Sequence, residues 1–180
     1  KPLMEILNLL KKRVPFENLH TVPQVAFLNA IEASLPKNKN WEDQYLNGHD
    51  ACLTDKINYA KNFKIIEEES NLISSKRLIQ KAGNHHVVVN PPFPTITEKE
   101  IDTVYELPFT YLPHPKYANK GNIPAYEMIK HSINIHRGCF GGCSFCTISA
   151  HQGKFIVSRS ESSIKKELNK ITTLPDFKGH

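Results

Sequence analysis

Residues 132–146 read SINIHRGCFGGCSFC, and most of what the sequence reveals is concentrated there. The first five residues alternate around two isoleucines, as strand residues do, and the arginine and glycine that follow end the predicted strand. Cys139, Cys143 and Cys146 then follow in a C-x3-C-x2-C spacing. Beyond them, Ser160 is a suitable N-cap for an amphipathic helix. The order strand, cysteine loop, helix predicts the first βα unit of a parallel α/β barrel.

The cysteine spacing predicts an iron–sulfur cluster. The chain has four cysteines and no export signal, and crowded thiols in such a protein favour metal or cluster chemistry over disulfides. Cysteines three or four residues apart can wrap a short loop around one cubane cluster, and Gly141 and Gly142 allow that loop to turn tightly. Three thiolates leave one iron free to bind a small molecule. Cys52 lies in a predicted helix, and we interpret it as a core thiol.

Two other sites remain open on the residues alone. A structural zinc ion could be held by the three cysteines together with His136 or His151. Cys143 and Cys146 also form a C-x-x-C pair, which is typical of redox sites. Zinc knuckles favour paired C-x2-C units, however, and neither alternative explains a third cysteine between a strand and a helix.

The sequence before the cysteine loop predicts a mixed α/β region. The expected elements, in order, are an opening helix that ends near Val14, strands at 21–29 and 41–46, one long helix or two joined end to end from 51 to 82, a strand at 86–89, and a helix that starts with a capping box at Thr97. Gly83 would stop the long helix. Its buried stripe would consist of Leu53, Ile57, Ala60 and Phe63. The proline run at 90–94 is a stiff connector.

The composition resembles that of a soluble protein, with 39% hydrophobic residues and no apolar run long enough to cross a bilayer. No signal peptide is recognisable, so the expected compartment is the cytoplasm. The net charge of +5 would suit nucleic acid. The basic residues are scattered and no nucleic-acid motif accompanies them, so we do not expect nucleic acid as a partner. Because the chain starts at Lys1 and stops in mid-course, we expect a fragment of a longer protein.

With Phe145 before its last cysteine, the loop resembles that of the radical S-adenosylmethionine (SAM) superfamily. The stretch from Ile123 to Ser160 is similar to the YgiQ family of radical SAM proteins. The resemblance extends upstream through FKIIEEESN at 63–71, VVNPP at 88–92, TEKE at 97–100 and LPHP at 112–115. It covers nearly the whole chain from about Val14, and is therefore more specific than the cysteine motif alone.

The resemblance implies a 4Fe–4S cluster held by Cys139, Cys143 and Cys146, with SAM on the open iron. Reductive cleavage of SAM would give a 5′-deoxyadenosyl radical that acts on a substrate the sequence does not name. An external electron donor such as flavodoxin or ferredoxin is implied as a partner. In the superfamily the aromatic residue before the third cysteine often contacts adenine, which would be the role of Phe145. Alternatively, Phe145 and Phe140 shield the cluster from water.

The fold implied is a partial α/β N-terminal region at residues 1–122, followed at residues 123–180 by the start of a radical SAM, partial TIM-like barrel. Since the later strands of that barrel lie outside this sequence, we do not expect the chain alone to turn over. Arg137 and Arg159 could meet the SAM carboxylate or a cluster sulfide, or form ordinary ion pairs. The alternative function is a non-catalytic, zinc- or cluster-stabilised binding module, with RNA as a candidate ligand.

Overall fold

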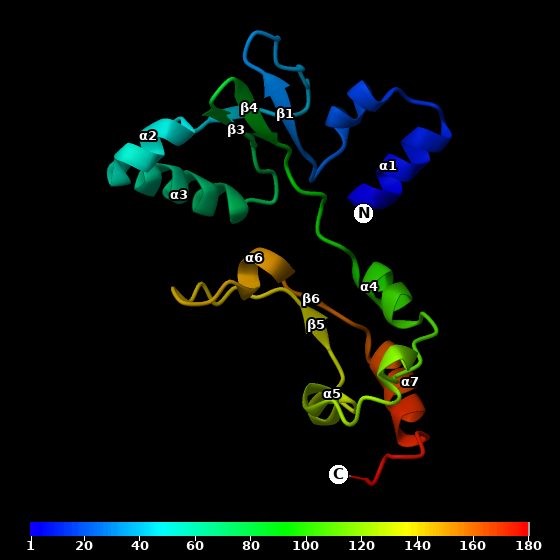
Figure 1. Cartoon of the computed structure of the whole chain (residues 1–180). Helices are drawn as coiled ribbons and strands as arrows, with labels where there is room; N and C mark the ends of the chain where they lie inside the picture. Colours follow the sequence, from blue (N-terminus) through cyan, green and yellow to red (C-terminus); the bar gives the residue numbers. More distant parts are fainter. Residues whose placement is uncertain (180) are drawn as a thin grey trace. The chain divides into compact units, whose positions relative to one another are not determined.

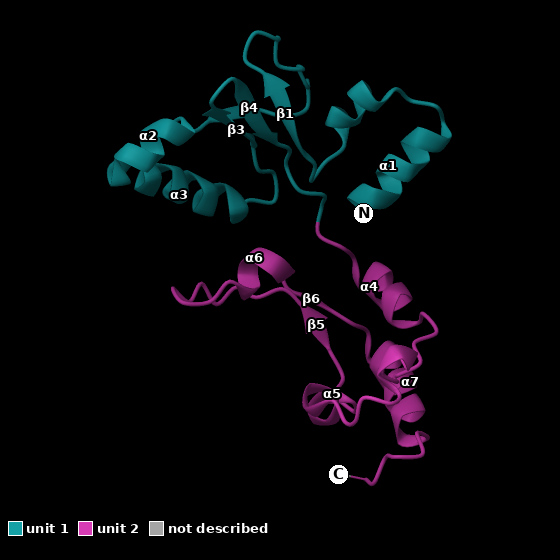
Figure 2. Cartoon of the chain, in the orientation of Figure 1, with its two compact units in different colours: residues 1–94 teal, residues 95–180 magenta. Residues whose placement is uncertain are grey.

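The computed structural model describes residues 1–179 and divides the chain into two compact units, residues 1–94 and residues 95–180 (Figures 1 and 2). The division falls directly after the proline run at 90–94, where the sequence predicts a stiff connector. The border that we predict at 122/123 lies between the N-terminal region and the start of the barrel, and it does not refer to compact units. It stays a prediction.

The first unit is built on a four-stranded sheet with the strand order β1-β4-β3-β2. Its strands are β1 (Ala26–Ala30), β2 (Asp43–Tyr45), β3 (Arg77–Ala82) and β4 (His85–Val89). β4 pairs antiparallel with both β1 and β3, whereas β2 runs parallel to β3. Ile79 and Val88 are register partners within the sheet, and their exposures of 1% and 0% place them in the core of this unit.

Helices flank and connect the strands of this sheet. They are α1 (Pro2–Lys11), the 3-10 helix η1 (Phe16–Thr21), α2 (His49–Thr54) and α3 (Lys56–Ser70). Because parallel strands need a crossover connection, α2 and α3 carry the chain from β2 to β3 (Figure 1). Asp55 caps α3, since its side chain accepts a hydrogen bond from the N–H of Ile57.

The opening helix and the strands predicted at 41–46 and 86–89 are confirmed. The strand predicted at 21–29 forms only from Ala26 onward, because the chain first makes the 3-10 turn of η1. Proline at position 23 cannot donate to a strand ladder, which agrees with the late start of β1.

The prediction of one long helix, or two joined end to end, from 51 to 82 is confirmed only in its first part, where α2 and α3 follow one another. The helical part ends at Ser70, and Arg77–Ala82 is strand β3, so Gly83, at φ +54°, turns a hairpin into β4 instead of stopping a helix. The composition favours a helix locally, but pairing with strands on both sides buries Ile79 and outweighs that preference.

The buried stripe expected along this helix is also wrong. Leu53, Ile57 and Phe63 are 72%, 64% and 57% exposed, and Ala60 is exposed as well. The buried residue of α3 is Asn62, whose side chain exchanges hydrogen bonds with the Asn47 backbone at 2.8 and 2.9 Å. Polar contacts, not an apolar stripe, therefore attach α3 to the end of β2.

The second unit consists of short helices around a two-stranded ladder. Its elements are α4 (Glu98–Tyr105), η2 (Pro115–Tyr117), α5 (Pro124–Ile129), β5 (His136–Arg137), α6 (Ile148–Gln152), β6 (Val157–Ser158) and α7 (Glu161–Thr172). The predicted capping box at Thr97 and the predicted cap at Ser160 are both formed. Ile101 and Ile171, each 1% exposed, form the core of this unit from α4 and α7.

The strand predicted at 132–136 is shorter and later than expected. β5 comprises only His136 and Arg137, and it pairs antiparallel with β6. The cysteine loop follows β5 and the helix predicted after Ser160 forms as α7, but α6 and β6 lie between the loop and α7. No parallel partner of β5 lies within residues 1–179, and the barrel stays a prediction.

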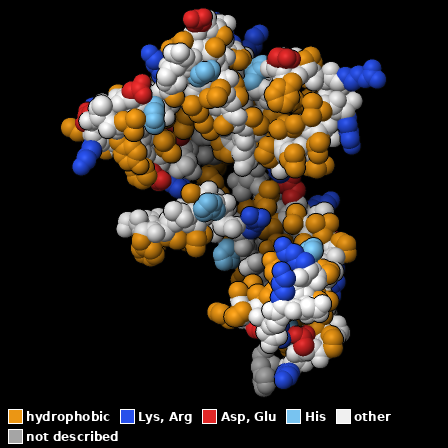
Figure 3. All heavy atoms as spheres, viewed as in Figure 1, with side chains coloured by type: hydrophobic (Ala, Val, Ile, Leu, Met, Phe, Trp, Pro, Cys, Tyr) orange, Lys and Arg blue, Asp and Glu red, His pale blue; other side chains and the backbone are white. Residues whose placement is uncertain are grey.

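Much apolar surface stays exposed on each unit (Figure 3). In the second unit Met128, Phe140 and Phe145 are 84%, 81% and 88% exposed. None of the helices in residues 1–179 combines the length and the apolar character needed to span a membrane.

Candidate metal centre

The cysteine loop leaves β5 and returns to β6 through a tightly closed base. The N–H of Cys139 donates to the carbonyl of Gly153 at 2.9 Å, and Arg137 pairs in register with Val157. Gly138 lies between these two contacts with φ +98° and is buried. Backbone contacts therefore anchor the loop at its first cysteine.

Two of the three predicted thiols gather around Gly141. A Cβ atom at this glycine would lie 3.4 Å from Cys139 Sγ and 3.6 Å from Cys143 Sγ. Gly142 has φ +58°, which favours glycine, and the N–H of Cys146 donates to the carbonyl of Cys143 at 3.0 Å. The glycine pair thus makes the turn that the sequence predicted and leaves room between two sulfur atoms.

The third thiol does not join the other two at single-ion distance. Within residues 1–179, no three or more His, Cys, Asp or Glu side chains are grouped so that they could hold one metal ion, which applies equally to His136 and His151. All three cysteines are free, with Cys143 exposed and Cys139 and Cys146 half-buried. In residue type and in the placement of two sulfurs, the loop fits a cluster.

Phe140 and Phe145 extend from the loop into solvent. Their exposures of 81% and 88% mean that neither ring covers the sulfur atoms, so the shielding alternative has no support in this conformation. Both rings are accessible to a ligand that lies beside the loop.

Sequence reasoning missed the network that holds the chain after β6. The guanidinium of Arg159, 4% exposed, forms a buried ion pair with Glu167 and donates to the Ser163 hydroxyl at 2.9 Å. It also donates to the carbonyl of Asn134 at 2.9 Å, and it lies 3.9 Å above the Tyr105 ring. The spacing of Arg159, Ser163 and Glu167 over four and eight residues is the signal that could have revealed it.

The two arginines differ in their contacts. Arg159 is fully engaged in structural contacts that join the segment before β5 to α7. Arg137 donates from Nε to Gln152 Oε1 at 3.1 Å, near the base of the cysteine loop, and its side chain is exposed.

Burial, with the neighbouring carboxylate of Glu167 as a second cause, raises the pKa of Tyr111.

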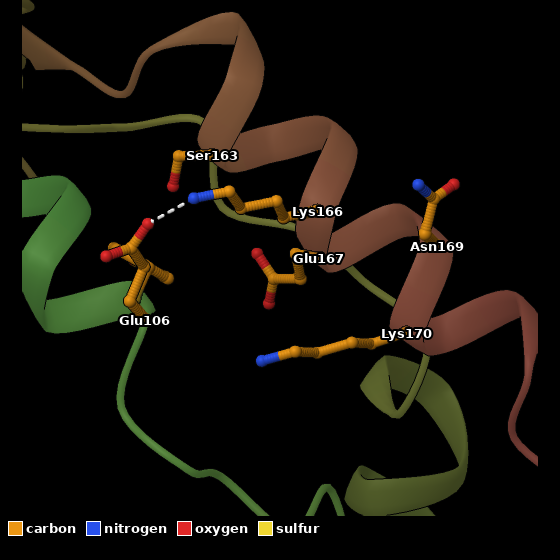
Figure 4. Close-up of a pocket in the computed structure, with 7 residues that line it drawn as sticks. Glu106, Ser163, Lys166, Glu167, Asn169 and Lys170 are labelled. Carbon is orange, nitrogen blue, oxygen red and sulfur yellow. Dashed lines mark hydrogen bonds and ion pairs between the residues drawn. The ribbon is translucent and has the colours of Figure 1, made fainter.

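A surface pocket of about 560 Å³ lies between α4 and α7, and no cysteine lines it (Figure 4). Its walls are Tyr105, Glu106, Ser163, Lys166, Glu167, Asn169 and Lys170. Lys166 donates to Glu106 at 2.7 Å across it, and this contact raises the pKa of Lys166. Glu106 and Lys166 are thus paired with each other, and Glu167 is paired with Arg159, so the loop remains the candidate site.

Comparison with known families identifies the family of the chain. The family model for the radical SAM N-terminal region matches residues 1–132. This chain belongs to the radical SAM N-terminal family. The matched region of this radical SAM N-terminal chain ends shortly before Cys139, so the family model itself does not include the cysteine loop.

Relatives of the radical SAM N-terminal chain align over the loop as well. A UPF0313 protein of Bacteroides thetaiotaomicron is 49% identical over 191 residues, which cover 100% of this chain and 30% of the relative. One from Porphyromonas gingivalis is 50% identical over 183 residues, covering 99% and 28%. UPF0313 protein YgiQ of Escherichia coli is 42% identical over 166 residues, covering 91% and 22%.

These relatives confirm the resemblance to the YgiQ family. Where the whole of this chain aligns with a relative, the aligned part is about 30% of the relative's length. No solved structure matches it.

Proposed function

We propose that this chain is part of a radical SAM enzyme in which Cys139, Cys143 and Cys146 hold a 4Fe–4S cluster. When bound, the cluster supplies the electron for reductive cleavage of SAM, which would occupy the iron without a protein thiolate. The observation that carries the proposal is the convergence of Cys139 Sγ and Cys143 Sγ around Gly141, in a chain of radical SAM ancestry.

The chain's own residues contribute geometry and access. Cys139 is fixed by its N–H bond to Gly153, whereas Cys143 is exposed and free to meet an incoming cluster. The exposed ring of Phe145 offers an apolar face on which the adenine of SAM would stack. An external donor such as flavodoxin or ferredoxin would deliver the electron, and the substrate would be bound by parts of the enzyme beyond this chain.

Anaerobic reconstitution of the gene product that contains this sequence tests the proposal. We expect about four irons and four sulfides per chain, and 5′-deoxyadenosine after reduction in the presence of SAM. Stoichiometric zinc without sulfide would instead identify a zinc-stabilised binding module and would refute the enzyme.

Alanine at any one of Cys139, Cys143 or Cys146 should abolish iron retention, because each would remove one of only three protein ligands. Cys52→Ala is the matched control. Cys52 lies in the first unit, where its sulfur accepts a hydrogen bond from Asn62 Nδ2 at 3.1 Å. The Cys52→Ala substitution should therefore leave the iron content unchanged. Loss of iron from Cys52→Ala would show that the assignment of three ligands is wrong.

A further inference from the structure

We propose that Gly138 is the positioning residue of the cysteine loop. Lacking a side chain, it lets the two backbones at the loop's base approach closely, and this approach fixes Cys139. The inference rests on the proposed function, because it concerns how the same loop presents its first thiol.

The steric evidence is the space that Gly138 leaves. A Cβ atom there would lie 2.1 Å from the carbonyl oxygen of Phe155 and 2.8 Å from its carbonyl carbon. Both are backbone atoms, so no side-chain rotation can relieve the clash. Reaching the 3.4 Å of an ordinary contact requires the two backbones to separate by about 1.3 Å.

Contacts on both sides of Gly138 depend on that approach. On one side Arg137 pairs with Val157, and on the other the N–H of Cys139 donates to Gly153 at 2.9 Å. A separation of about 1.3 Å would lengthen the second bond beyond the range of hydrogen bonds. Cys139 would then lose the contact that anchors it, and its sulfur would no longer be held beside that of Cys143.

A second glycine separates the effect of the close approach from the effect of backbone strain. Gly121 has φ +77°, so it adopts a conformation that favours glycine, as Gly138 does. A Cβ atom at Gly121 would meet nothing within 4 Å. Alanine at Gly121 therefore carries the conformational cost without the clash.

The test compares Gly138→Ala with Gly121→Ala in the gene product that contains this sequence, after anaerobic reconstitution. Retention of iron is measured against a chelator, and the cluster is examined by electron paramagnetic resonance. We expect Gly138→Ala to retain iron about 10-fold more weakly, the scale typical of residues that orient metal ligands, and to show an altered resonance signal. Gly121→Ala should behave like the unmodified protein. Equal retention in Gly138→Ala and Gly121→Ala would overturn the inference.

Hydrogen exchange of the cluster-free chain provides a readout that needs no iron. The Cys139 amide should be protected in the unmodified chain and exchange at least about 10-fold faster in Gly138→Ala, since its acceptor moves away. Unchanged exchange would overturn the inference. If Gly138→Ala also exchanged faster throughout α4 and α7, the substitution would destabilise the whole second unit, and a role of Gly138 confined to the loop would be overturned. If no variant takes up iron and sulfide, the proposed function fails, and exchange at Cys139 still decides the role of Gly138.

Discussion

At the scale of single residues, the strongest constraint in the second unit is the buried ion pair of Arg159 and Glu167. Arg159 is 4% exposed and Glu167 is 9% exposed, and the guanidinium also donates to the Ser163 hydroxyl and the Asn134 carbonyl. Burying two charges is costly, so the pair is stable only while each partner neutralises the other. The segment before β5 is thus joined to α7 through charges that must stay together.

Glu167→Ala should therefore destabilise the second unit by about 3–5 kcal/mol, because it leaves the Arg159 guanidinium buried without its carboxylate. Chemical unfolding followed by circular dichroism would measure the loss. Lys166→Ala, one residue away on α7, is the matched control. Its pair with Glu106 is exposed, with 65% and 51% side-chain exposure, and should matter little. Equal effects of the two substitutions would contradict the structural role of the buried pair.

Single residues also show where prediction from sequence succeeds and where it stops. The glycine pair at 141 and 142 was predicted to turn the loop, and the structure confirms the turn, because backbone freedom depends on the residue itself. The burial of Arg159 was not predicted, because it depends on Tyr105 and Asn134, which are distant in sequence. Ligation by the cysteines stays a prediction, as does adenine stacking on Phe145.

At the scale of elements, local signals predicted helix starts well and strand pairing poorly. The capping box at Thr97 and the cap at Ser160 are formed as expected, since each involves residues within three positions. β3 was mistaken for helix, because its stability comes from pairing with β2 and β4 across the sheet. β5 is shorter than predicted, because its partner β6 offers only two residues to pair.

The contact between α4 and α7 should depend on pH through Asp102. Its carboxylate on α4 accepts the Ser160 N–H at 3.0 Å, where α7 begins, and hydrogen bonds from Ser160 lower the pKa of Asp102 below 3.8. The folded state thus favours the charged form. The resulting stabilisation is fully present above pH 3.8 and is lost as the pH falls through the lowered pKa.

The free energy of unfolding of the second unit, measured from pH 6 to pH 2, should therefore fall at the acid end. Asp102→Asn should make this fall shallower, since it removes the group that titrates. An identical acid profile in Asp102→Asn and the unmodified chain would exclude Asp102 as a cause.

At the scale of the whole molecule, the chain consists of two compact units with separate cores. Ile79 and Val88 belong to the first, and Ile101 and Ile171 to the second. All three candidate cysteine ligands and the base of their loop belong to the second unit. Since a ligand stabilises only the structure to which it binds, a cluster held by this loop should act on one unit and leave the other unaffected.

Trp41, the single tryptophan of the chain, lies in the first unit and is half-buried, so its fluorescence reports on that unit alone. Reconstitution with iron and sulfide should raise the unfolding midpoint of α7, which is measured by hydrogen exchange. It should leave unchanged the unfolding midpoint of the first unit, which is measured by Trp41 fluorescence. The Cys143→Ala chain, treated in the same way, should show no shift in either. A matching rise at Trp41 would show that the two units unfold together, because only coupling between them could carry stabilisation from the loop to the sheet.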